Sequence, residues 1–131
     1  MAFVIEQADE EKKKKPDDGF KLSSDSGNIA SGASVSNAIS LGKARVLGVV
    51  IPSNFDGEKI SFQVSFDNGA TFVSLVDNLG DDHYIDTKAG SFTPVDQAVF
   101  ASVTLVKILS GVSETPVNVS VDTTFQLVVS Y

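Results

Sequence analysis

The sequence contains no cysteine and no tryptophan, and it has one histidine and two tyrosines in 131 residues. The absence of cysteine excludes disulfide bonds, thiolate metal ligands and a cysteine nucleophile. Basic residues are also few: 10 Lys and Arg against 17 Asp and Glu give a net charge of −7. A field of that sign repels nucleic acid and anionic membranes, so we expect neither as a partner. Without disulfide bonds, the stability of the fold must come from packing or from assembly.

Long apolar runs are missing as well. No stretch approaches the ~20 apolar residues that a membrane-spanning helix needs. The N-terminal segment Met1–Glu6 has no basic residue, and its apolar part is too short for a signal peptide. We therefore expect the whole chain to be made in a cytoplasm and to remain uncleaved.

A strict alternation of apolar and polar residues runs from Ile60 to Phe66. This period of two is typical of a strand with one face in a core and the other in water. Asp67-Asn68-Gly69 follows directly, and a second apolar-rich stretch covers residues 71–76. The sequence therefore predicts a β-hairpin here.

The same pattern of short strands and turn residues continues to Tyr131. It predicts about eight strands, and strands at such spacings form a sandwich or a barrel. The predicted strands cover residues 38–41, 44–51, 59–66, 71–76, 83–86, 101–110, 118–121 and 124–130. Residues 94–100 are predicted to form at most a short helical turn, with Thr93 as its N-cap.

Alternation also assigns the inward faces of these strands. Three sets of alternating apolar residues are expected to face the core: Ile60, Phe62, Val64 and Phe66; Phe125, Leu127, Val129 and Tyr131; and Val117, Val119 and Val121. The strand at 101–110 has apolar residues on both faces. It is therefore expected to be central in its sheet, or to have its outer face covered by the arm or by another subunit.

Residues 1–36 differ in composition from the rest. Blocks of acidic and basic residues occupy 9–18, and Ser, Gly, Ala and Asn dominate 23–36. Such a segment is either a disordered tail or an arm that orders on a neighbouring subunit. Spaced apolar residues favour the arm, with the sandwich domain beginning at residue 37. The anchors expected for assembly are Phe3, Val4, Ile5, Phe20, Leu22 and Ile29.

No residue pattern predicts catalysis or a cofactor. His83 lies among loop carboxylates, and no Gly-x-Ser-x-Gly elbow marks a nucleophile for it. Asp77, Asp81, Asp82 and Asp86 could offer oxygen ligands to calcium, but their spacing does not match an EF-hand loop. We therefore expect no enzyme activity, no catalytic residues, no cofactor and no metal site.

Three segments carry a resemblance to a known class of protein. Residues 46–52, residues 60–72, and residues 106–111 together with 115–118 resemble a small tailed-bacteriophage virion surface protein of the decoration, cement or head-fibre type. The likeness covers about residues 44–131 and implies a jelly-roll-like antiparallel β-sandwich. The same residues are similar, more weakly, to the jelly rolls of carbohydrate-binding and discoidin-like modules.

The resemblance also implies a function. A virion surface protein of this type decorates or cements the capsid exterior, contacts the major capsid or another virion protein, and forms a homo-oligomer, with a trimer favoured. It carries over no catalytic residues. The alternative implied by the second resemblance is a carbohydrate- or receptor-binding module, with or without calcium, whose site lies in loops 77–86 and 90–95.

Overall fold

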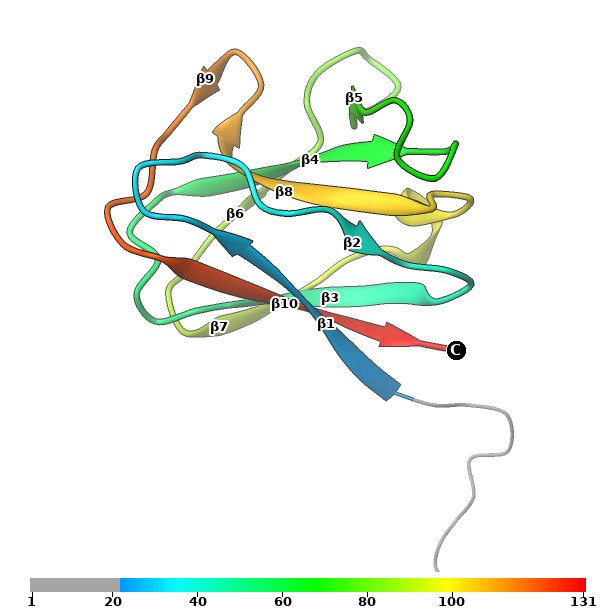
Figure 1. Ribbon diagram of the computed structural model, residues 1–131, viewed down its shortest axis with the longest axis horizontal. Coiled ribbons are helices and arrows are strands. Elements are labelled where there is room, and N and C mark those ends of the chain that lie inside the picture. The colour runs from blue at the N-terminus through cyan, green and yellow to red at the C-terminus, as the bar shows by residue number, and fades with distance from the viewer. Residues whose placement is uncertain (1–21) are drawn as a thin grey trace, which may run out of the picture.

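The computed structural model describes residues 22–131, which form a sandwich of two antiparallel sheets (Figure 1). The first sheet has the order β1 (Leu22–Ile29), β10 (Thr123–Ser130), β3 (Arg45–Ile51) and β7 (Ser91–Pro94). The second sheet has the order β2 (Ile39–Ser40), β8 (Leu105–Val112), β4 (Lys59–Ser65) and β5 (Val73–Ser74), with β6 (Tyr84–Asp86) on β4 and β9 (Thr115–Pro116) on β8. The predicted all-β class is confirmed.

The chain passes from one sheet to the other at six of the nine connections between the described strands. The first sheet holds β1, β3, β7 and β10, and the second holds β2, β4, β6 and β8. Only the β4–β5–β6 and β8–β9 connections stay within a sheet. In the second sheet, β8 lies between β2 and β4, so the first of the two alternatives for its two-sided apolar pattern, a central strand, is confirmed.

The core lies between the two sheets and uses the predicted inward faces. Ile60, Phe62 and Val64 of β4 are at most 2% exposed. From the other sheet, β10 contributes a matching row that is fully buried, namely Phe125, Leu127 and Val129. Removal of this apolar surface from water is the main term that stabilises the sandwich.

The predicted inward orientation is wrong for residues that lie beyond the end of a strand. Phe66 and Tyr131 are 58% and 56% exposed, because β4 ends at Ser65 and β10 ends at Ser130. Residues 118–121 are not a strand, and Val117 and Val121 are half exposed while Val119 is buried. The Val119 backbone instead bonds to Gly32 and Ala33 in the loop after β1. Alternation alone does not distinguish an extended connection from a strand.

The described part of the N-terminal segment belongs to the sandwich. Residues 22–29 form β1, an eight-residue strand paired with β10 from Leu22↔Ser130 to Ile29↔Thr123. Farther along, the Ser36 hydroxyl is buried and accepts a hydrogen bond from the Ile108 amide at 2.9 Å. The boundary predicted at residue 37 is therefore too late. The sandwich includes residues 22–36.

Two further elements differ from the prediction. The four-residue strand β7 was not predicted, and the helical turn is a 3-10 turn over Gln97–Phe100. Its N-cap is Asp96, whose side chain accepts a hydrogen bond from the Ala98 amide at 3.0 Å, whereas Thr93 and Pro94 lie in β7. The predicted cap is wrong because pairing with β3 keeps residues 91–94 extended.

Candidate functional site

The predicted assembly anchors lie in different surroundings. Phe3, Val4, Ile5 and Phe20 are outside the described residues. Leu22 begins β1, and Ile29 at the other end of that strand is fully buried in the core of its own chain. Ile29 therefore anchors β1 within one subunit and does not offer its side chain to a neighbour.

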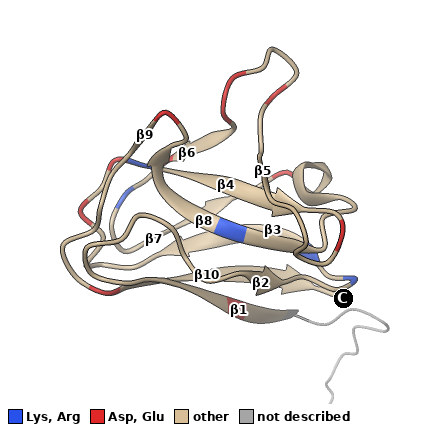
Figure 2. Ribbon diagram, turned by 45° about the horizontal axis from the view of Figure 1, so that its top comes forward, with Lys and Arg blue, Asp and Glu red and all other residues tan. Residues whose placement is uncertain are grey.

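The outer face of the first sheet carries no charged side chain apart from Arg45 at the start of β3. Its residues are those that alternate with the buried ones, because successive side chains of a strand point to opposite faces. They are Ser24, Ser26 and Asn28 of β1, Thr124, Gln126 and Val128 of β10, Gly48 and Val50 of β3, and Phe92 and Pro94 of β7. Figure 2 shows the ribbon of β10, β3 and β7 without charged residues except at the start of β3.

Hydrogen bonds and one aromatic ring order this face. The Ser26 hydroxyl donates to Gln126 Oε1 at 3.2 Å, and the Thr124 hydroxyl donates to Asn28 Oδ1 at 2.8 Å. The Phe92 ring lies against Gly48, where a Cβ would collide with the ring and with the Thr93 carbonyl oxygen. Phe92 is nevertheless 50% exposed. Contact over this face, away from Arg45, would bury no charged side chain.

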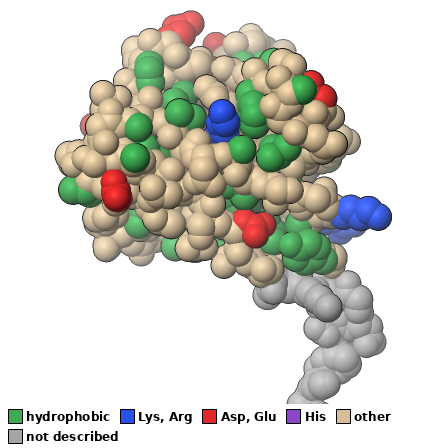
Figure 3. Space-filling view, viewed as in Figure 1, with side chains coloured by type: hydrophobic (Ala, Val, Ile, Leu, Met, Phe, Trp, Pro, Cys, Tyr) green, Lys and Arg blue, Asp and Glu red, His purple; other side chains and the backbone are tan. Residues whose placement is uncertain are grey.

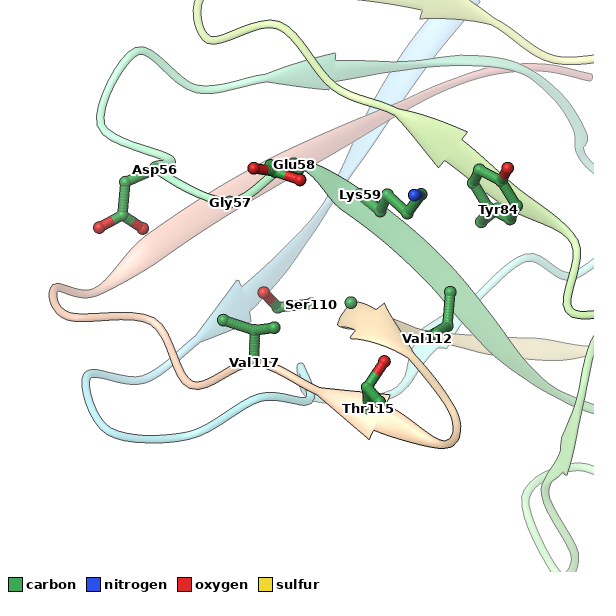
Figure 4. A pocket seen from close by; sticks show the side chains of 10 residues that line it. Asp56, Gly57, Glu58, Lys59, Tyr84, Ser110, Val112, Thr115 and Val117 are labelled. Carbon is green, nitrogen blue, oxygen red and sulfur yellow. The ribbon is translucent and has the colours of Figure 1, made fainter.

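A hollow of about 590 Å³ lies on the second sheet, where β8 separates from β4 (Figure 4). Gly111 causes the separation: it has a φ of +89°, and a Cβ there would lie 2.6 Å from the Thr115 carbonyl oxygen. Beyond it, Gly111 and Val112 pair with β9 instead of β4. The hollow was not predicted from the sequence, in which Ser110-Gly111 indicates only a turn.

One wall of the hollow is polar, and the opposite wall combines the apolar Val112 and Val117 with the polar Ser110 and Thr115. Lys59 Nζ lies over the Tyr84 ring, 4.9 Å from its centroid, and Figure 4 shows both on the wall opposite Val112. Deeper in, the buried Ser110 hydroxyl has no hydrogen-bond partner, while the neighbouring Ser61 hydroxyl donates to the Gly111 carbonyl at 2.8 Å. Lys59 and Tyr84, which line the hollow, are the groups placed to meet a small polar ligand.

Two of the four carboxylates considered for calcium, those of Asp77 and Asp82, accept hydrogen bonds that order the surrounding loops. Asp77 Oδ1 accepts hydrogen bonds from the Leu79 and Asp81 amides at 2.8 and 3.1 Å. Asp82 accepts from the Ser113 amide at 2.6 Å and from its hydroxyl at 2.7 Å, which joins this loop to the β8–β9 hairpin. Within residues 22–131, no group of three or more His, Cys, Asp or Glu side chains is placed to hold a metal ion.

The backbone of His83 takes part in the hydrogen bonding between neighbouring segments of the second sheet. Its amide donates to the Leu75 carbonyl at 2.9 Å, next to the isolated β-bridge between Val76 and Asp82. It is half-buried and is not among the residues that line the hollow. In the described part of the chain, no helix is long and apolar enough to cross a membrane.

Comparison with known proteins gives one similar structure. No protein-family model matches the sequence, and no curated protein matches it significantly. The fold is similar to that of the SPBc2 prophage-derived protein YomS, with a TM-score of 0.55, over 86% of this chain and 95% of that chain. The two sequences are 19% identical over the match, so this likeness shows a shared fold.

Proposed function

We propose that this protein is a structural component of a phage virion that decorates or cements the capsid exterior in many copies. The observation that carries the proposal is the fold similarity to a prophage-derived protein, which extends over 95% of that protein's chain. Fold alone does not assign a function, so the surface must supply the rest of the argument.

The outer face of the first sheet supports this role. An acidic chain with a net charge of −7 repels other copies wherever its carboxylates face each other. The uncharged face around Phe92 and Gln126 avoids this repulsion and has ordered side chains, so contact costs little conformational entropy there. In this role the binding partner is the major capsid protein or another virion protein. Many weak contacts of this kind add up through avidity when copies are arrayed on a shell.

A binding experiment tests the proposal. Particles of the encoding phage that lack this protein are mixed with the purified chain and sedimented. Co-sedimentation that saturates at a fixed number of copies per particle is expected. Phe92→Asp places a charge on the uncharged face, in its edge strand β7, and should abolish co-sedimentation, whereas Phe66→Asp, at an exposed position just after β4 of the other sheet, should not. A chain that stays in the supernatant contradicts the proposal.

The second candidate is a carbohydrate- or receptor-binding module, and the hollow beside Gly111 favours it. Its lining combines donors and acceptors with the apolar side chains of Val112 and Val117, as a saccharide requires. The site then differs from the loops that the sequence indicated, although Tyr84 belongs to both. Screening the purified chain against a glycan array, with and without a calcium chelator, tests this candidate, and an array without signal in either condition removes it.

A further inference from the structure

We propose that the exposed edge of β1 pairs with β1 of a second copy, in antiparallel orientation, to join the first sheets of two subunits. The pairing deepens the proposed role as a multi-copy component and rests on it. Its occupant is a second copy of this chain, bound through main-chain hydrogen bonds. The pairing has three requirements. The edge of β1 must be open, the register of two β1 strands must be self-complementary, and charge repulsion must not oppose their approach.

Among the described residues, the edge of β1 is covered at one end and unpaired at the other. The Asn28 amide donates to Asn37 Oδ1 at 2.8 Å, and its carbonyl accepts from the Asn37 amide at 3.4 Å. Alternate residues of an antiparallel strand direct their backbone groups to the same side. The backbone N–H and C=O groups of Ser26, Ser24 and Leu22 therefore also point away from β10. No described strand pairs with these groups.

The other sheet edges of the described chain are protected. At the far side of the first sheet, β7 has four residues and ends in Pro94, which has no amide to donate. In the second sheet, β2, β5 and β9 have two residues each and β6 has three. Short strands and proline are the usual means by which proteins block pairing at an edge. By contrast, β1 has eight residues without proline or lysine.

The open residues fit a two-fold axis. With Ser24 opposite Ser24 of the second copy, Leu22 lies opposite Ser26 and Ser26 opposite Leu22. All of these residues direct their backbone groups to the new partner, so about six main-chain hydrogen bonds form. The same patch serves both subunits, as a closed two-fold interface demands. Because the axis relates one pair of copies, the contact predicts an even-numbered assembly, whereas the family resemblance implies a trimer.

Charge permits the approach of two acidic chains at this edge. Asp25 is the charged residue of β1, and in the proposed register it lies opposite Ser23 of the other copy and not opposite another carboxylate. Figure 3 is viewed on the side where β1 lies in front, and charged side chains are sparse on it. The joined sheet would carry its uncharged outer face across both subunits.

The mass of the full chain in solution, measured by light scattering, tests the pairing. We expect twice the 13.8 kDa of one chain, and a return to a single-chain mass for Ser24→Pro. Proline removes the outward amide of residue 24 but none of the amides that bond to β10. Ser24→Thr keeps the amide, favours a strand and should leave the mass doubled. A single-chain mass for the unmodified protein, or a doubled mass for Ser24→Pro, overturns the pairing.

Hydrogen exchange keeps the test decisive if Ser24→Pro does not fold. In the unmodified chain, the amides of Ser24 and Ser26 should become more protected as protein concentration rises, while that of Asn28 should not change. Exchange at Ser24 and Ser26 that is independent of concentration overturns the pairing. A monomer that still binds particles would overturn the pairing alone, and a pair that does not bind them would overturn the proposed function alone.

Discussion

The ring of Phe62 meets the ring of Phe100 edge to face, with centroids 5.1 Å apart and planes at 88°. Phe62 lies in β4, and Phe100 ends the 3-10 turn that leads from the first sheet to the second. Both rings are buried, so this contact fixes the crossover connection against the core. Edge-to-face contact adds to the burial of the two rings, since the positive edge of one ring meets the negative face of the other.

Phe62→Ala should destabilise the protein by ~3–5 kcal/mol, because it removes a fully buried ring and leaves a cavity. Urea denaturation followed by circular dichroism measures the change. Phe66→Ala, four residues along but 58% exposed, is the matched control and should cost under ~1 kcal/mol. A cost under ~1 kcal/mol for Phe62→Ala would mean that the inward face of β4 is assigned wrongly.

Ser36→Ala should cost ~1–3 kcal/mol, although the sequence places Ser36 in the arm. The hydroxyl accepts from the buried Ile108 amide at 2.9 Å and donates to the Asn37 carbonyl at 2.8 Å. Its removal leaves the Ile108 amide without a partner. The same denaturation assay applies, with exposed Ser53→Ala as the control. If stability is unchanged, the loop after β1 does not pack on β8 as described.

Gly111→Ala should destabilise the β8–β9 hairpin by ~1–3 kcal/mol, because φ there is +89° and the added Cβ would press on the Thr115 carbonyl. Gly80→Ala is a matched control, with a φ of +88° but open space around the Cβ. The difference between the two variants in thermal denaturation isolates the steric part. A smaller loss for Gly111→Ala than for Gly80→Ala would contradict the kink that opens the hollow.

Asp67→Asn should destabilise the β4–β5 hairpin at neutral pH and have little effect in acid. The Ser65 hydroxyl, and then the Thr71 amide, donate to the Asp67 carboxylate and hold its pKa below the ordinary value of 3.8. A lowered pKa contributes stability above the unfolded value, and this contribution is lost as pH falls through the folded one. The free energies of unfolding of the unmodified protein and of Asp67→Asn, measured from neutral to acidic pH, give this contribution. A gap that widens towards acid would contradict the assignment.

The sequence predicted the strands that are bounded by clear turn residues. The hairpin after Ile60 was predictable because Asp67-Asn68-Gly69 supplies a turn with positive φ at Asn68 and Gly69. β1 was missed because its sequence, LSSDSGNI, is polar and contains a glycine. Pairing with β10 makes it a strand, and Gly27 lets it pass close to the Ile39 and Ile108 side chains. Such tertiary context overrides weak strand propensity.

The candidate surfaces were less predictable than the fold. The apolar residues of β10 indicated which face is buried, but the uncharged outer face combines alternate residues of four strands that are distant in sequence. The hollow likewise depends on the path of β8 after Gly111, which no periodicity encodes. The alternation of Val117 and Val121 predicted a strand that is absent, since only Val119 between them reaches the core.

Electron cryo-microscopy of purified virions of the encoding phage tests the central claim most directly. The account predicts density for a two-layer β-sandwich at repeated positions on the outside of the shell, with the outer face around Phe92 against a neighbouring protein. A complete particle reconstruction without this sandwich, from virions that mass spectrometry shows to lack the chain, would contradict the account.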